Sequence, residues 1–292
     1  MRMETGIAFM PQASGLSFGF GKIGGEKWSV PLKFSFHRNS EFKKIGLLYR
    51  RSNVDLKGFS LCKKTEEVVS ELQQTNKQTG DEDLALKREA EIVAPYLSGQ
   101  GIYLVGMMGS GKTTVGKILS EALDYSFLDS DELVEHNVGV SSVAQIFDEH
   151  GEEFFRINET KALKQLSTEK RLVVATGGGI VTKPINWKYM KKGLSVWLDV
   201  PLDSLARRIA AVGTASRPLL HKEAAGDAYT LVFNELTALY EERGENYKNA
   251  DVRVALENLA TGKQDVNSLT PEAIAIEILT KIKDFLLTNQ FV

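Results

Sequence analysis

The chain of 292 residues lacks several features, and each absence excludes some kinds of site or classes of protein. It holds one cysteine, Cys62, so the rest of the chain has no disulfide and no thiolate cluster for a metal, which suits a reducing compartment. No uninterrupted apolar run approaches the roughly 20 residues of a membrane-spanning helix, so we expect no membrane partner. No internal repeat is visible.

Outside the first 64 residues, acidic residues outnumber basic ones. Those residues carry 12 Lys and Arg against 4 Asp and Glu, whereas residues 65–292 carry 24 against 34. An acidic body gives no electrostatic reason to expect a nucleic-acid partner. The basic stretch 1–64 is rich in hydroxyl residues and lacks sustained periodicity, which is typical of an organelle transit peptide. A disordered basic tail is the alternative, and composition leaves both chloroplast and mitochondrion open.

What the remainder does have is a regular alternation of apolar runs and helical patterns. A helical pattern over 65–74, a polar gap over 75–83 and a second helix over 84–94, stopped by Pro95, come first. Five apolar runs follow, with helices between them: 102–105, 126–129, 172–175, 194–198 and 252–254. This order predicts an α/β fold in which helices cover both faces of a parallel sheet. Residues 213–229 are polar and contain Gly and Pro, so we expect a mobile lid there.

The strongest motif lies between the first apolar run and the helix after it. It has the form G-x-x-x-x-G-K-T and consists of Gly106, Met107, Met108, Gly109, Ser110, Gly111, Lys112 and Thr113. A phosphate-binding loop requires a preceding strand and a following helix. Its glycines turn backbone N–H groups onto phosphate oxygens, and the helix adds its positive N-terminal end. Lys112 would then reach the β- and γ-phosphates, and the Thr113 hydroxyl would bind Mg²⁺.

Two acids, Asp129 and Asp131, follow the second run, where a parallel strand would end beside the phosphate loop. Alternation along a strand points both carboxylates to the same side. Phosphoryl transfer to an alcohol needs one carboxylate beside Mg²⁺ and one beside the attacking hydroxyl. A helix N-cap at Asp129 or Asp131 is the alternative, and it accounts for one acid but not for both.

Glycines and arginines supply candidates for the acceptor side. Gly177, Gly178 and Gly179 follow the third run, and residues without side chains let backbone N–H groups approach a ligand closely, although a simple turn is the alternative. Arg156 lies in an expected helix, Arg217 in the expected lid and Arg243 in a late helix. An arginine is usually a solvated surface charge. A small carboxylate substrate favours paired guanidinium groups, however, and an arginine closing over phosphates would stabilise transferring charge.

Taken in order, these motifs resemble shikimate kinase, and in particular its plant plastid form, from about residue 84 to the C-terminus. The resemblance implies the three-layer fold of nucleoside monophosphate kinases, with a five-stranded parallel sheet, a lid and a substrate-binding segment. It further implies phosphorylation of the 3-hydroxyl of shikimate by ATP, in the pathway to chorismate and the aromatic amino acids. The domains implied are a plastid transit peptide at 1–64, a linker at 65–90 and a kinase domain at 91–292, acting in the chloroplast stroma.

The resemblance also assigns a role to each matched residue. ATP would be bound by residues 106–114, including Thr114, and by Arg217, with Lys112 and Arg217 acting on the transferred group. Thr113 and Asp129 would hold Mg²⁺. Asp131 would bind the substrate hydroxyls and act as the candidate base at the 3-hydroxyl. Shikimate would be bound by Asp131, Gly177, Gly178, Gly179, Arg156 and Arg243, with the two arginines clamping its carboxylate. The family's adenine contact has no clear counterpart in 257–269.

Two rival functions stay open from the sequence. A small sugar-acid kinase, such as a gluconate kinase, would share the fold, but the two arginines and the triple glycine argue against it. A non-catalytic plastid relative would be expected to lose catalytic positions, whereas this chain keeps every position that can be matched. The oligomeric state, monomer or homodimer, is also open.

Overall fold

A computed structural model describes residues 63–213, 227–260 and 265–289, with side chains from residue 80 onward. Arg217 and all but the last two residues of the expected transit peptide lie outside the described residues, as does most of the expected lid. Among the described residues, no helix combines the length and the apolar character needed to cross a bilayer.

Five parallel strands form the centre of the fold, in the order β2-β3-β1-β4-β5. They are β1 (Ile102–Val105), β2 (Ser126–Asp129), β3 (Leu172–Ala175), β4 (Leu194–Asp199) and β5 (Val252–Ala255). Every residue of β1 and β3 is buried, because a central parallel strand is covered on both faces and must be apolar throughout. The predicted α/β class, with a five-stranded parallel sheet, is therefore confirmed.

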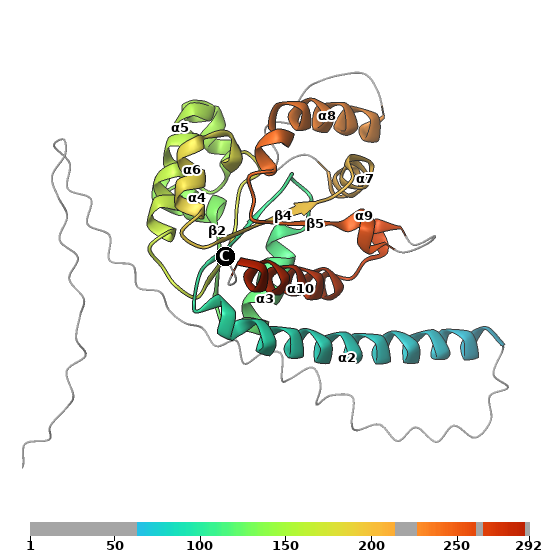
Figure 1. The fold of residues 1–292 in the computed structure, drawn as a ribbon. Coiled ribbons are helices and arrows are strands. Elements are labelled where there is room, and N and C mark those ends of the chain that lie inside the picture. Colours follow the sequence, from blue (N-terminus) through green and yellow to red (C-terminus); the bar gives the residue numbers. More distant parts are fainter. Residues whose placement is uncertain (1–62, 214–226, 261–264, 290–292) are drawn as a thin grey trace, which may run out of the picture. The chain divides into compact units, whose positions relative to one another are not determined.

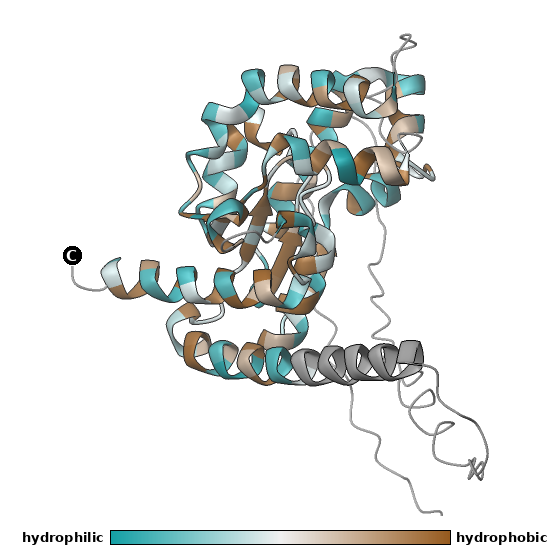
Figure 2. Ribbon diagram, turned by 90° about the vertical axis from the view of Figure 1, so that its right-hand side faces the viewer, coloured by the Kyte–Doolittle hydropathy of each residue, from teal (hydrophilic) through white to brown (hydrophobic). Residues whose placement is uncertain are grey.

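Helices cover both sides of this sheet (Figure 1). α2, α3 and α10 lie on one side and α7 and α8 on the other, while α4, α5 and α6 gather near β2. Figure 2 shows hydrophobic strands at the centre, surrounded by helices in which hydrophilic and hydrophobic residues alternate. The helices are α2 (Lys63–Leu97), α3 (Lys112–Leu123), α4 (Ser130–Val138), α5 (Val143–Leu166), α6 (Pro184–Met190), α7 (Leu202–Val212), α8 (Ala228–Tyr247), α9 (Leu256–Leu259) and α10 (Pro271–Asn289), with short 3₁₀ turns η2 (Ile180–Thr182) and η4 (Val266–Ser268).

The polar gap expected over 75–83 is wrong, because α2 is one continuous helix that runs past Pro95 to Leu97. Its buried residues Leu86, Ala90, Val93 and Leu97 recur every three or four positions, which gives one apolar stripe. α2 packs against α10, and Lys283 Nζ donates to Glu89 Oε2 at 2.9 Å. Packing of α2 against the distant helix α10 therefore stabilises a helix that the local sequence pattern predicts only in part.

A break at Gly151 directs the second half of α5 toward the sheet's carboxyl edge. Gly151 has φ 81° and ψ 170° inside α5, so the helix is broken at this residue. The Ser142 hydroxyl accepts the Gln145 N–H and caps the first half. The Gln145 carboxamide, however, accepts from Ser141 and not from the cap residue. Beyond the break, α5 carries Arg156 and Glu159 inward.

Candidate active site

The loop between β1 and α3 has the geometry of a phosphate cradle. Gly106, Gly109 and Gly111 all have positive φ, and a Cβ on Gly106 would lie 2.7 Å from the Leu198 carbonyl oxygen. Only glycine fits such a position without strain. Lys112 is buried, and its Nζ donates to the carbonyls of Gly106 and Met107, each at 2.8 Å. The loop thus holds an ammonium group at the N-terminus of α3, where an anion would be bound.

Arg208 on α7 joins this loop to the segment that the sequence left unassigned. Its Nη1 donates to the Gly109 carbonyl at 3.4 Å, and its Nε donates to Asn267 Oδ1 in η4 at 2.8 Å. The neighbouring Arg207 instead pairs with Asp203 one turn earlier on the exposed face of α7. Nothing in the local sequence distinguishes the two arginines, and only the fold shows which one reaches the phosphate loop.

Asp129 connects β2, α3 and α4. Its Oδ2 accepts the Thr113 hydroxyl at 2.9 Å, and its Oδ1 accepts the Asp131 N–H at 3.0 Å, which caps α4. The N-cap alternative therefore holds for Asp129, but it does not exhaust the role of that carboxylate. The argument from strand alternation is wrong, because β2 ends at Asp129 and Asp131 lies in the first turn of α4. The cap, and not the pleat, brings the two acids together.

The pair Thr113 and Asp129 fits a magnesium ion. A hydroxyl and a carboxylate in contact beside the phosphate loop are hard oxygen ligands, and Mg²⁺ commonly takes one or two protein oxygens and completes its shell with phosphates and water. In the described part of the chain, no group of three or more His, Cys, Asp or Glu could hold a metal alone. The site therefore suits an ion that arrives with a nucleotide.

The Asp131 carboxyl is buried and unusually weak as an acid. Burial, together with the nearby carboxylates of Glu159 and Asp129, raises its pKa to about 7, against the opposing charges of Lys112 and Arg156. A carboxyl group with a pKa near neutrality can both accept and release a proton at physiological pH, as a base at a reacting hydroxyl must. The predicted candidate base thus has a matching environment.

Arg156 is buried in a clamp of two acids on its own helix. Its Nη1 donates to both oxygens of Glu159, at 3.1 and 3.0 Å, and its Nη2 donates to Glu152 Oε1 at 3.0 Å. Glu159 is fully buried, and its charge lies near those of Arg156, Arg243 and Lys183. Sequence reasoning missed Glu159, although an acid three residues after a candidate arginine on the same helix face is a readable signal.

Arg243 on α8 is a buried arginine with a guanidinium N–H that makes no hydrogen bond. It is only 4% exposed, and its Nε makes no hydrogen bond; the nearest acid, Glu242, lies 3.6 Å away. A buried guanidinium N–H without an acceptor costs free energy unless a ligand supplies one. Arg156 and Arg243 both approach the charge of Glu159, so the structure brings the two predicted arginines to one cluster.

The triple glycine turns its carbonyls into the protein and leaves N–H groups for a ligand. The carbonyls of Gly177, Gly178 and Gly179 accept from Ile180 N–H, the Tyr247 hydroxyl and the Thr182 hydroxyl. Among the described residues, the N–H groups of Gly178 and Gly179 have no acceptor. A Cβ on Gly177 would lie 2.6 Å from Asp131 Oδ1, and one on Gly179 would overlap the Arg156 guanidinium. Side chains would therefore displace the predicted acceptor groups.

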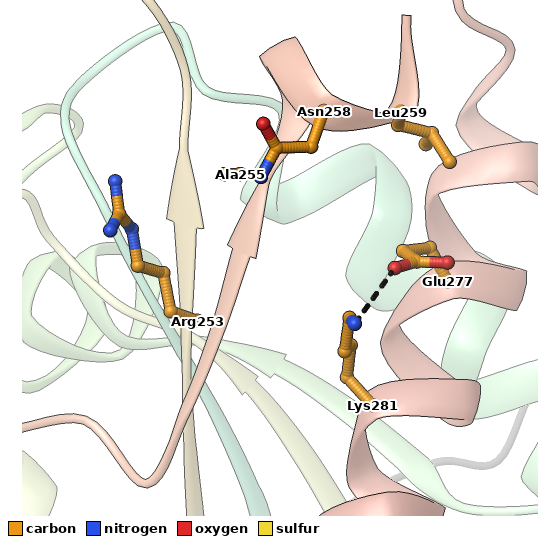
Figure 3. Close-up of a pocket in the computed structure, with 6 residues that line it drawn as sticks. All are labelled: Arg253, Ala255, Asn258, Leu259, Glu277 and Lys281. Carbon is orange, nitrogen blue, oxygen red and sulfur yellow. Dashed lines mark ion pairs between the residues drawn. The ribbon is translucent and has the colours of Figure 1, made fainter. Parts of the chain in front are cut away.

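A cavity of about 320 Å³ lies elsewhere, at the edge strand β5 (Figure 3). Its walls come from β5, α9 and α10: Arg253, Ala255, Asn258, Leu259, Glu277 and Lys281. The charges are already paired, since Lys281 lies 3.7 Å from Glu277 and Arg253 donates to Asp199 while stacking on Trp197. None of the predicted site residues lines this cavity, so it is separate from the phosphate loop.

A phosphate loop and a buried acid–arginine cluster meeting at the carboxyl edge of a 2-3-1-4-5 parallel sheet define a P-loop kinase that acts on a small molecule. Comparison with known proteins narrows this class. The family model described as shikimate kinase matches residues 108–282. The chain belongs to the shikimate kinase family.

Individual relatives agree with this assignment. Shikimate kinase 3, chloroplastic, of Oryza sativa subsp. japonica is 64% identical over 210 residues, which cover 71% of this chain and 73% of the relative. Shikimate kinase 1, chloroplastic, of Arabidopsis thaliana is 60% identical over 208 residues, covering 70% and 68%. A solved shikimate kinase from Acinetobacter baumannii in complex with shikimate superposes with a TM-score of 0.54 at 32% identity, over 68% of this chain and 99% of that one. The predicted family, fold and kinase activity are confirmed.

Proposed function

We propose that the chain phosphorylates the 3-hydroxyl of shikimate with Mg²⁺ and ATP at the site built from the phosphate loop and the acid–arginine cluster. One observation carries this proposal: the buried Arg243 Nε makes no hydrogen bond, and among the described residues the N–H groups of Gly178 and Gly179 have no acceptor, in a turn that contacts the phosphate loop. A Cβ on Gly178 would be only 3.4 Å from the Met108 nitrogen, so the acceptor turn and the donor loop are in contact.

The donor half is formed by residues 106–114. Their N–H groups and Lys112 bind the phosphates of ATP, which the family uses as its co-substrate, with Thr114 on the first turn of α3. Thr113 and Asp129 would hold Mg²⁺, which would supply charge neutralisation at the transferred phosphoryl group. We further propose that Arg217 approaches that group from the lid; Arg217 lies outside the described residues.

The acceptor half orients a hydroxylated carboxylate. Arg156, Arg243 and the N–H groups of Gly178 and Gly179 bind the carboxylate with charge-assisted hydrogen bonds. Asp131 accepts a hydrogen bond from the 3-hydroxyl and takes its proton during transfer, at a carboxyl oxygen. Glu159 holds the Arg156 guanidinium in place. Catalysis then consists of positioning and charge neutralisation, because little covalent chemistry falls to the protein.

Water must be excluded, or ATP is hydrolysed. The described ends of the expected lid are Gly213, which ends α7, and Asp227, which caps α8 by accepting the Thr230 N–H. The last two residues of the expected lid, 228 and 229, belong to α8, and the Tyr229 hydroxyl donates to Asp203 Oδ1 at 2.6 Å. α7 and α8 pack against each other, and residues 214–226 of the proposed lid lie outside the described residues.

The relatives are named as chloroplastic proteins, and we propose that this chain too acts in the plastid, in the stroma, after loss of a transit peptide within residues 1–64. We propose that residues 65–90 form the linker that precedes the kinase domain at 91–292. The buried side chains of Leu86 and Ala90 already belong to the core.

The proposed function is tested by a coupled assay of ADP release. The full chain is given ATP, Mg²⁺ and either shikimate or a panel of sugar acids that includes gluconate. We expect turnover with shikimate, loss of turnover when EDTA removes Mg²⁺, and little turnover with the sugar acids. A preferred acceptor other than shikimate would refute the proposal, and absence of turnover with every acceptor would favour a non-catalytic relative.

The contact between Gly179 and Arg156 gives a specific prediction. Gly179→Ala places a methyl group on the guanidinium, so we expect the KM for shikimate to rise at least about 10-fold as the carboxylate clamp is displaced. The KM for ATP should change less than about twofold, since the donor loop is untouched. Gly80→Ala on α2, where a Cβ meets nothing within 4 Å, is the control. An unchanged KM for shikimate would contradict the assigned clamp.

A further inference from the structure

One buried side chain contacts both halves of the proposed site. Tyr247 is the last residue of α8 and is fully buried, with its ring stacked on Trp197 at 5.7 Å between centroids. Its hydroxyl donates to the Gly178 carbonyl at 2.6 Å and lies 3.5 Å from the Met107 sulfur of the phosphate loop. A phenol has one proton, and the short bond to Gly178 uses it. The contact to Met107 is therefore one of packing.

The bond to Gly178 fixes a peptide whose other end faces the acceptor site. The Gly178 carbonyl and the Gly179 N–H belong to the same planar trans peptide, so they point in opposite directions. Because the Tyr247 hydroxyl holds the Gly178 carbonyl, the Gly179 N–H points away from Tyr247. Gly179 lies beside the Arg156 guanidinium, since a Cβ added to it would overlap that group. The N–H is thus presented beside the arginine that we assign to the substrate carboxylate.

The position of Tyr247 in α8 strengthens this link. Arg243 precedes it by four residues, so the two side chains share one face of the helix. Both side chains are buried, and the positive charges of Arg243 and Arg156 lie close enough to the phenol to lower its pKa. Burial nevertheless raises the pKa of Tyr247, so its hydroxyl stays protonated and remains a donor across the physiological range.

We propose that Tyr247 is a positioning residue for the acceptor, which aligns the Gly179 N–H with Arg156 and Arg243 to bind the substrate carboxylate. This proposal rests on the proposed function. Glycine leaves this peptide free to rotate in the absence of a restraint, and an anion-binding N–H gains affinity when its direction is set before the ligand arrives. Tyr247 acts through the backbone and does not itself contact the reacting atoms.

The test is Tyr247→Phe, which removes the hydroxyl and keeps the ring stacked on Trp197. We expect the KM for shikimate to rise about 10-fold, with kcat and the KM for ATP within about twofold of wild type. The methyl ester of shikimate has no carboxylate, so its KM should be the same in both proteins. A merely structural role would move the ATP and ester values as well.

Tyr103→Phe is the matched control. Tyr103 is also buried and its hydroxyl also donates to a backbone carbonyl, that of Leu166 at 3.4 Å, but β1 carries it outside the site. We expect wild-type kinetics from Tyr103→Phe. Should Tyr247→Phe not fold, 3-fluorotyrosine incorporated at position 247 keeps the ring and makes the hydroxyl a stronger donor. The KM for shikimate should then fall, with no change for ATP.

The outcomes separate the two proposals. If the wild-type chain does not phosphorylate shikimate, the proposed function fails. If it does, and Tyr247→Phe keeps the wild-type KM for shikimate or raises the KM for ATP and the ester equally, the positioning role of Tyr247 is refuted while the proposed function stands.

Discussion

Asp131→Asn should lower turnover of shikimate by about 100-fold or more while leaving ATP binding nearly intact. The substitution keeps the size of the side chain and removes the carboxylate that would take the proton of the 3-hydroxyl. The phosphate loop, Thr113 and Asp129 are unchanged, so the donor half keeps its contacts. Single-turnover kinetics and nucleotide titration measure the two effects separately. An Asp131→Asn protein with near-normal kcat would remove Asp131 from the mechanism.

The same substitution should make the protein without ligands more stable at pH 8. The Asp131 pKa is raised from 3.8 to about 7 in the folded state, so between these values the folded state binds the proton more tightly than the unfolded state does. Stability therefore decreases as pH rises through this window, by about 2–4 kcal/mol in all. An uncharged Asn escapes this cost, which we expect to show as an increase of several degrees in Tm at pH 8.

Thermal unfolding in EDTA, without nucleotide, measures this effect at pH 5 and pH 8. At pH 5 the wild-type carboxyl is protonated, so the difference between the two proteins should nearly vanish. Asp148→Asn, at an exposed acid of α5, serves as the control and should show no such dependence on pH. A Tm difference that is equal at the two pH values would show that burial of the Asp131 charge is not its cause.

Lys112→Met should lower turnover even more than Asp131→Asn does, with kcat/KM falling by about 1,000-fold or more. The ammonium group is held inside the loop by the Gly106 and Met107 carbonyls, so its positive charge lies at the phosphate site before ATP arrives. Methionine is similar in length but offers neither charge nor donor to the phosphates. The loss should appear in the KM for ATP and in kcat, because both the ground state and the transition state carry phosphate charge.

Lys117→Met provides the comparison for this prediction. Lys117 lies on the same helix with its ammonium over the exposed side of the Phe127 ring, at 5.6 Å from the centroid. Its replacement should leave kcat/KM within about twofold of wild type. If Lys112→Met retained a tenth of the wild-type turnover with normal circular dichroism, Lys112 would not have the role assigned to it.

The sheet could be read from the sequence almost residue by residue, because central parallel strands are short, fully apolar runs bounded by polar residues. Predicted run 102–105 and strand β1 coincide, for example, and so do 172–175 and β3. α2 could not be read in the same way. Its polar middle has no helical pattern of its own, and its stripe has meaning only once α10 is in place.

The site divides along the same line. Residues in a contiguous motif, such as Gly106–Thr113, could be predicted because the local backbone sets their geometry. Arg208 and Tyr247 could not, because each acquires its partner through the fold: Tyr247 and Gly178 are 69 residues apart, and Arg208 and Gly109 are 99 apart. Glu159 differs from them, since its partner Arg156 lies three residues away on the same helix. The sequence identifies side chains that meet ligands more readily than those that hold other side chains in place.

The pairing of α2 with α10 sets the order in which the chain can mature. Glu89 and Lys283 are 194 residues apart, so α2 meets α10 only after the last helix has been made. Until then the apolar stripe of Leu86, Ala90, Val93 and Leu97 has α3 but not α10 to pack against, and the N-terminal part of the domain is incomplete. The first described helix thus depends on the last, and a chain shortened past Leu86 would lose part of the core.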